Sequence, residues 1–326
     1  MGRNIKRRAF LAGVTTAACL GTPLSAVQGE VAAKPGAPAA REVRLEHLRP
    51  REIEEAMRAC PVLFLPLGTI EWHGLHNVVG LDAVKAHLLC VRAAQQGGGL
   101  VAPALFGGVG GMDEPHTFVM EPENDLFSVL LRPWVEKLCK EAVRQGFRAI
   151  IVLTGHYGAA QQIVVREAAV LMTRVLGVPV LGTPEYILGL DAGYLGDHAA
   201  WGETSLMMYL DPSSVDLSRL GNEPHKGVGG RDPKQFATEA DGRKIAETII
   251  ARLADLARQM PAWDKATVAR FADAEGALVE RQKTLAGQEK SVWAGWRNLG
   301  KGVLHDYARL LAERKFDDIA ALAAKL

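Results

Sequence analysis

Cysteine is scarce in this chain, and its few positions are far apart. Of four cysteines in 326 residues, Cys19 lies near the amino terminus, and Cys60, Cys90 and Cys139 are spread over the rest. Such spacing matches neither a disulfide framework nor a thiolate zinc motif. We therefore expect the last three to behave as small apolar side chains, most of them buried.

A net charge is also missing. The 38 Lys and Arg residues are scattered among 37 Asp and Glu residues, which leaves a formal charge of +1. This balance gives no electrostatic reason to expect a nucleic-acid or membrane-surface partner. The glycine runs at 97–99 and 107–111 do not stand between a strand and a helix, so they predict turns and not a phosphate-binding loop.

No apolar run reaches the about 20 residues that a membrane-spanning helix needs. Instead, a basic head at residues 3–8 is followed by a short apolar stretch to about Leu20 and by small residues at 25–26. This order is typical of a signal peptide and less typical of a disordered basic tail. Because residues 7–11 (RRAFL) also resemble a twin-arginine export signal, we expect residues 1–26 to direct export to the periplasm or beyond.

The rest of the chain divides into a leader, a core and an extension. Cleavage would follow Ala26 or lie near Ala33, and residues 27–41 have the Ala, Gly and Pro content of a flexible leader. In residues 42–262 short apolar runs alternate with helical patterns, which favours parallel βαβ units. We expect an α/β fold with three αβα layers and a mainly parallel sheet. Residues 263–326 predict a helical extension that packs on the core or on a neighbouring subunit. The expected strands are 62–65, 101–104, 149–153 and 178–181, and the expected helices are 82–94, 126–145, 159–175, 241–259, 274–286 and 303–311.

Two side chains that bind metals well follow the first apolar run. Glu71 and His73 come shortly after residues 62–65, and Asp82 lies a short step further on. In an extended chain, side chains at i and i+2 share a face, so Glu71 and His73 aim at one point while Trp72 faces away. In an arbitrary Glu-x-His triplet, the Glu and His side chains are usually a solvated surface pair. This remains the alternative to a metal site unless other parts of the chain supply further ligands.

Two further motifs could contribute ligands to the same site as Glu71, His73 and Asp82. His156 follows the buried run 149–153, and His198 and Glu203 precede another apolar run, with Glu203 in the first turn of an expected helix. Open α/β sheets bind ligands beyond the carboxyl ends of their strands. Imidazole and carboxylate ligands without thiolate suit zinc, manganese or iron, and two-metal hydrolases use a carboxylate to bridge the ions. We assign that bridge to Asp82.

Three blocks of this sequence resemble the creatininase (creatinine amidohydrolase) family in order and spacing. They are PLGTIEWHGLH at 66–76 followed by Asp82, GHYG at 155–158, and DHAAWGETS at 197–205. The resemblance covers roughly residues 43–262. It implies a mainly parallel sheet sandwiched by helices, metal-dependent hydrolysis of small cyclic or linear amides, and a homo-oligomer, often a hexamer.

The same resemblance implies a role for each motif residue. The family's metal ligands are matched by Glu71, His73, Asp82 and His156. Asp82 takes the position between two ions, and His198 matches the catalytic histidine that protonates the leaving nitrogen. Glu203 matches a glutamate that supplies a carboxylate at the metal in several branches. Its alternative role is the base that takes the proton of the attacking water.

One position departs from the family pattern. Creatininase itself has a glutamate ligand two residues after the histidine matched by His156, and this chain has Gly158 there. Other branches carry GHGG in this place, and Glu203 would then complete the second site. We expect a metal-dependent amidohydrolase with one or two ions, zinc first and manganese or iron as alternatives. The competing hypothesis is an exported metal-binding or small-molecule-binding protein without turnover.

The substrate contacts are the least defined part of the site. His76 and His116 either contact the substrate or form hydrogen bonds within their loops. Three aromatic residues either wall a small pocket or belong to the core: Trp72, Tyr157 and Trp201. For His198 the alternative is a helix-capping or core histidine, and for Glu203 it is a carboxylate stabilised by a helix dipole.

Overall fold

The computed structural model describes residues 41–108, 111–112, 114–118, 130–222, 225–289 and 301–326. All of them belong to one unit that spans residues 40–326. The predicted signal peptide (1–26) and all but the last residue of the predicted leader (27–41) lie outside the described residues. Among the described helices, none combines the length and apolarity needed to cross a membrane.

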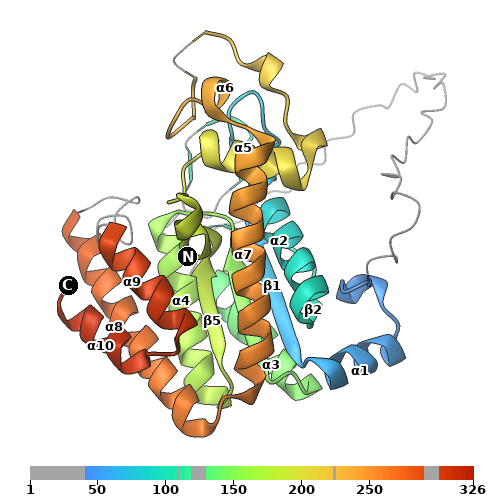
Figure 1. The fold of residues 1–326 in the computed structure, drawn as a ribbon, viewed down its shortest axis with the longest axis vertical. Helices are drawn as coiled ribbons and strands as arrows, with labels where there is room; N and C mark the ends of the chain where they lie inside the picture. The colour runs from blue at the N-terminus through green and yellow to red at the C-terminus, as the bar shows by residue number, and fades with distance from the viewer. Residues whose placement is uncertain (1–40, 109–110, 113, 119–129, 223–224, 290–300) are drawn as a thin grey trace, which may run out of the picture. The chain divides into compact units, whose positions relative to one another are not determined.

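A five-stranded sheet forms the centre of this unit (Figure 1), and all its described strand pairs are parallel. The order is β2-β1-β4-β5, with β3 also beside β1. The strands are β1 (Val62–Gly68), β2 (Leu100–Val101), β3 (Leu105–Phe106), β4 (Ala149–Thr154) and β5 (Val180–Pro184). The strand expected at 101–104 is split in two because Pro103 has no N–H to donate to β1.

Helices cover both faces of the sheet, as expected for buried parallel strands. On one face are α1 (Pro50–Ala59), α3 (Arg132–Gln145) and α4 (Ala159–Leu176), and on the other are α2 (Leu81–Gly97) and α7 (Glu239–Gln259). Side chains alternate along a strand, so the two faces of the sheet have separate hydrophobic cores. Leu63 and Ile150 lie in the core on the side of α1, α3 and α4, and Phe64 and Ile151 lie in the core on the side of α2 and α7. The predicted three-layer αβα arrangement is confirmed.

The carboxy-terminal extension consists of α8 (Lys265–Glu289), α9 (Lys301–Ala312) and α10 (Phe316–Ala324), and it packs on the core of its own chain. The rings of Trp263, Phe271 and Phe316 meet edge to face at 5.2–5.4 Å between centroids. Arg166 of α4 forms a buried ion pair with Glu275 of α8. The helix expected at 274–286 begins earlier, at Lys265, and α10 has no counterpart among the expected helices.

Besides the sheet and the longer helices, the described residues form α5 (Trp201–Leu210), which is the helix expected to begin near Gly202, and several short helical elements. They are η1 (Leu45–His47), η4 (Glu185–Ala192), η5 (Pro212–Ser214), η6 (Leu217–Arg219), α6 (Pro233–Phe236) and η7 (Met260–Ala262). The register pairs Leu67 of β1 with Thr154 of β4, so the two strands end level with each other. The segments that carry Glu71, His73 and His156 therefore leave the sheet at the same edge.

Candidate metal centre

Two glycines bring the start of α2 against the ends of β1 and β4. A Cβ on Gly68 would lie 2.3 Å from the Ala83 nitrogen, and one on Gly155 would lie 2.1 Å from the Asp82 carbonyl oxygen. Any larger residue would push the helix away from the sheet edge. This close approach places the Asp82 side chain between the segments that follow the two strands.

Asp82 faces a different histidine with each of its carboxylate oxygens. Its Oδ1 lies 3.2 Å from Nε2 of His73, and its Oδ2 lies 3.1 Å from Nδ1 of His156. The same His156 nitrogen lies 3.0 Å from Oε2 of Glu71. All four side chains are nearly or completely buried. The convergence predicted from three separated segments is present, and Asp82 has the geometry of a bridging ligand.

Two groups of potential ligand atoms share Asp82. One consists of Glu71, Asp82 and His156, and the other of His73, Asp82 and Glu203, with the ligand atoms of each group within 4.8 Å of one another. Glu203 joins the second group through Oε2, which lies 3.6 Å from Nε2 of His73. The cluster therefore offers two sets of three potential ligands that share the Asp82 carboxylate.

The donor atoms fit a cation. Nδ1 of His73 donates to the carbonyl oxygen of Glu71 at 2.9 Å, which leaves the lone pair of His73 on Nε2. Within the described residues, His73 Nε2 and Glu71 Oε2 are buried without a hydrogen-bond partner. Nε2 of His73 and Oδ1 of Asp82 are then two acceptors that face each other, and a positive charge between them is needed to satisfy both.

The carboxylates have a strong effect on the imidazoles in the metal-free protein. Burial lowers the pKa of His73, but Asp82, Glu203 and Glu71 more than offset this effect and raise the pKa to about 9. The pKa of His156 is raised well above its usual value in the same way. Despite burial, the pKa of Asp82 is lowered by His73 and His156. Protons therefore occupy the positions for which metal ions would compete.

Glu203 reaches the cluster because the first turn of α5 is fixed by side-chain and backbone contacts. The Asp197 carboxylate accepts hydrogen bonds from the Gly202 and Glu203 N–H groups at 2.6 and 3.0 Å, which caps the helix. The N–H of Ala199 donates to Oε2 of Glu203 at 2.8 Å. The alternative of a solvated helix-terminal carboxylate is excluded by burial, since Glu203 is 1% exposed.

Behind the cluster lies a buried network that the sequence analysis missed. Lys85 Nζ donates to Oε1 of Glu203 at 2.5 Å and to the Tyr157 hydroxyl at 2.8 Å, and it lies 2.8 Å from Oε1 of Glu185. Burial lowers the pKa of Lys85, but Glu185 and Glu203 more than offset this and raise it, so the ammonium stays charged. Two signals were available: Lys85 lies three residues after Asp82 on one helix face, and Glu185 directly follows β5.

His198 lies beside the cluster. Its Nε2 donates to the carbonyl oxygen of Trp72 at 2.8 Å, and its ring packs on His73 at 4.4 Å between centroids. Nδ1 lies 3.9 Å from Oε1 of Glu71. Burial and the nearby His73 lower the pKa of His198. Two backbone hydrogen bonds with Gly229 hold the residue in place, so His198 presents Nδ1 at the cluster as a neutral imidazole.

The two other candidate histidines have different positions. His76 is buried, and its Nε2 lies 3.0 Å from the Thr204 hydroxyl, a contact that ties its loop to α5. His116 is exposed and has a positive φ of 65°. Nδ2 of Asn77 lies 3.1 Å from the same His76 nitrogen, so His76 also has a hydrogen bond within its loop, which is one of its two expected roles. Substrate contact by either histidine stays a prediction.

The three aromatic candidates are directed to different places. The Tyr157 hydroxyl belongs to the Lys85 network, where it also contacts Tyr194 at 2.7 Å. Trp201 donates its indole N–H to Asp241 of α7. Trp72 donates its indole N–H to the Lys226 carbonyl oxygen and is only half-buried. Trp72 and Trp201 are both partly exposed, whereas Tyr157 is buried, and substrate contact by any of the three stays a prediction.

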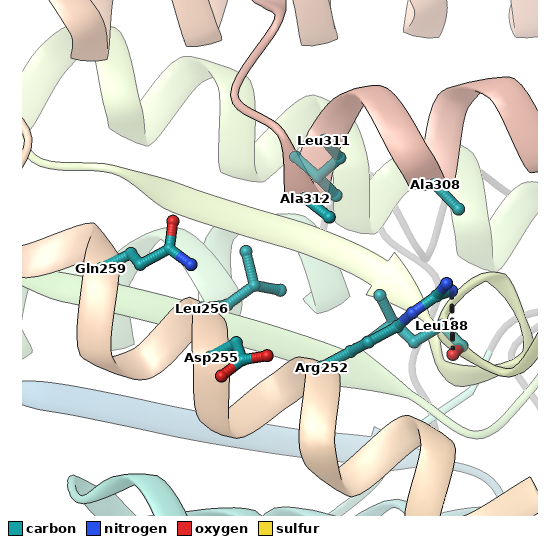
Figure 2. A pocket seen from close by; sticks show the side chains of 8 residues that line it. All are labelled: Leu188, Arg252, Asp255, Leu256, Gln259, Ala308, Leu311 and Ala312. Atoms are coloured by element: carbon teal, nitrogen blue, oxygen red, sulfur yellow. Dashed lines mark hydrogen bonds between the residues drawn. The ribbon is translucent and has the colours of Figure 1, made fainter.

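A small cavity lies elsewhere, where α7 and η4 face α9 of the extension (Figure 2). Figure 2 shows Leu256 of α7 and Leu311 of α9 on its walls, with Arg252 directed to the Leu188 carbonyl oxygen. The lining does not include the cluster residues described above. We interpret the cavity as a packing gap between the extension and the core.

Comparison with known proteins agrees with this site. Residues 46–257, well over half of the chain, match the family model described as Creatininase: Creatinine amidohydrolase. The chain belongs to the creatininase family. The matched residues include every member of the metal cluster and end before α8 begins.

Relatives within the creatininase family add detail. Creatinine amidohydrolase of Pseudomonas putida is 30% identical over 237 residues, which is 61% of this chain and 89% of that protein. A solved structure described as "Creatininase Mn" is 26% identical, with a TM-score of 0.57, and covers 68% of this chain and 100% of its own. A mutant creatininase of "Zn-Zn type" is also 26% identical, with a TM-score of 0.56, and covers 68% of this chain and 99% of its own. This protein is accordingly a metal-dependent amidohydrolase of the creatininase family.

Proposed function

We propose that this enzyme hydrolyses the C–N bond of a small cyclic or linear amide with the help of two divalent ions, zinc first and manganese or iron as alternatives. One observation carries the proposal. The two oxygens of Asp82 face His73 and His156 separately, and each histidine has a further carboxylate beside it. The absent glutamate at Gly158 is compensated by Glu203, whose Oε2 lies near His73.

The ions would be held by Glu71, Asp82 and His156 on one side and by His73, Asp82 and Glu203 on the other. When bound, such ions polarise an amide carbonyl and lower the pKa of water towards neutrality. The protein orients the ligands before metal arrives. Oε1 of Glu71 accepts the Met112 N–H at 2.7 Å, which leaves Oε2 directed at His156.

His198 is the residue that moves the proton. The Trp72 carbonyl oxygen fixes the proton of neutral His198 on Nε2, so Nδ1 is the nitrogen that can accept another. Because the lowered pKa leaves this imidazole neutral near pH 7, Nδ1 takes a proton released by the attacking water. It then donates that proton to the amide nitrogen, which otherwise leaves poorly.

The degree of burial limits the substrate to a small molecule. Glu71 and His73 are 0% exposed, and His198 keeps only 8% of its surface exposed. Only a compact amide can bring its carbonyl carbon close to such a cluster without rearranging the loops around it. This favours lactams, formamides and creatinine-like rings over peptides.

The test is a hydrolysis screen over these three amide classes with the parent and His198→Ala. We expect turnover of one class by the parent and its loss in His198→Ala, with the metal content unchanged. His305→Ala is the matched control, since His305 is an exposed histidine of α9 that pairs with Asp191. A protein that binds metal but shows no turnover dependent on His198 would instead be a binding protein of the same fold.

We also propose export and oligomerisation. Residues 3–26 support a twin-arginine-like signal, and the three cysteines of the described region are unpaired, which is compatible with folding before export. The homo-oligomer is proposed from the family resemblance. Cell fractionation tests the first, with the protein expected in the periplasm, and light scattering after gel filtration tests the second, with a mass several times 35.1 kDa expected.

A further inference from the structure

Lys85 is an unusual residue to find at the base of this site. It is 0% exposed, and its ammonium contacts Glu185, Glu203 and Tyr157. A buried lysine with several partners is held in one position, because every alternative leaves a charge uncompensated. The contacts therefore fix the place of Nζ within the core.

The fixed position of Nζ in turn orients the carboxylate of Glu203. Its Oε1 is held by Lys85 at 2.5 Å, so its Oε2 is turned towards His73, 3.6 Å from Nε2. The other contact of Oε2, with the Ala199 N–H, lies within the same chain segment. Without the ammonium, the Ala199 N–H still binds Oε2, but Oε1 loses its contact with Nζ, so the carboxylate of Glu203 is held at one oxygen instead of two.

We propose that Lys85 is a positioning residue that makes Glu203 a metal ligand, in place of the carboxylate that the chain lacks at Gly158. The inference rests on the proposed two-ion function. It assigns Lys85 to one half of the centre, the group of His73, Asp82 and Glu203. The other group consists of Glu71, Asp82 and His156, and none of the three residues that the Lys85 ammonium contacts (Glu203, Glu185 and Tyr157) belongs to it.

The competing explanation is that Lys85 only compensates buried carboxylates and so stabilises the core. The chain contains a matched comparison for this role. Arg166 and Glu275 form a buried ion pair to which the Tyr307 hydroxyl donates at 2.8 Å. Like the Lys85 network, it combines a cation, a glutamate and a tyrosine, but its residues belong to none of the candidate ligand groups.

The test is the titration of zinc chloride into metal-stripped full-length protein, with the number and affinity of bound ions read by calorimetry and elemental analysis. The variant is Lys85→Met with Glu185→Gln, which removes one positive and one negative charge together, so that Glu185 is not left as a buried carboxylate without its cation. The control is Arg166→Met with Glu275→Gln, which makes the same kind of change at residues that belong to none of the ligand groups. Thermal unfolding of each metal-stripped protein reports the cost to stability separately.

We expect the parent and the control to bind two zinc ions. We expect the Lys85 variant to keep one ion at the parental affinity and to bind the second about 10- to 100-fold more weakly. Two ions at parental affinity in the Lys85 variant would overturn the inference, as would an equal weakening in the control. Should this variant not fold, Lys85→Arg, which keeps the charge but changes its geometry, is titrated and judged by the same outcomes. A parent that binds fewer than two ions would refute the proposed function itself.

Discussion

Lys85 and Glu203 form a buried ion pair, with 2.5 Å between Nζ and Oε1, and the second oxygen of the same glutamate faces His73. This pair links α2, which carries Asp82, to α5, which carries Glu203. The two helices thus contribute to one ligand group through one shared contact. If Glu203 is a metal ligand, a change to this pair is expected to alter both the metal affinity and the stability of the core.

Asp82→Ala should remove both ions, because Asp82 belongs to both of the groups proposed to hold them, although not to the further group of Glu71, His73 and His198. We expect zinc content to fall from two ions per chain to none after gel filtration, and amide hydrolysis to fall with it. Asp317→Ala serves as control, since the Asp317 side chain is 79% exposed. One tightly held ion in Asp82→Ala would show that the carboxylate is not shared.

Glu203→Gln should lose only the ion held by His73, Asp82 and Glu203, because the other group keeps all its ligands. Adding Gly158→Glu should restore it, since this places a carboxylate where creatininase has one. The backbone at Gly158, with φ −49° and ψ 132°, is accessible to any L-residue. Elemental analysis decides: no gain of zinc in the double variant would contradict the idea that Glu203 replaces the missing ligand.

The metal-free protein should lose stability as the pH rises from about 6.5 towards about 9. The pKa of His73 is 6.5 in the reference state and is raised to about 9 by folding, so its protonation stabilises the native state most fully below 6.5. That contribution disappears as His73 deprotonates. Melting temperatures of chelator-treated protein should therefore fall by several degrees across this range, and zinc-loaded protein should fall less. Identical pH profiles for the two forms would contradict the coupling.

Glu275→Leu should destabilise the fold without changing the metal centre. The change leaves the buried Arg166 guanidinium without its carboxylate, which typically costs about 3–5 kcal/mol. Urea unfolding should show this loss, and the double change Arg166→Met with Glu275→Leu should recover part of it. A loss of zinc in Glu275→Leu would mean that the extension supports the site directly.

The sequence predicts the ligands well because their spacing depends on local geometry. Glu71 and His73 share a face of extended chain, and His156 follows a strand, so the sheet edge brings them together. Lys85 was not predicted, because its spacing from Asp82 places it on the same helix face but does not show that the lysine is buried. Its carboxylate partners, Glu203 of α5 and Glu185 of η4, are distant in sequence, so only the tertiary structure shows that they meet Lys85.

The errors in element boundaries also have physical causes. Pro103 divides an apolar run that otherwise indicates one strand, and it leaves β2 and β3 as two-residue pieces. α8 begins nine residues before the expected Ala274, since Phe271 packs against Trp263 and Phe316. That aromatic contact spans residues 263 to 316, a separation that no local window of sequence can detect.

The central claim is that Asp82 bridges two ions, and anomalous diffraction from zinc-loaded crystals tests it most directly. We predict two zinc peaks about 3.5–4 Å apart, each bound to one oxygen of Asp82, with His73 at one ion and His156 at the other. A single peak, or a pair of peaks that does not have Asp82 between them, would contradict the account.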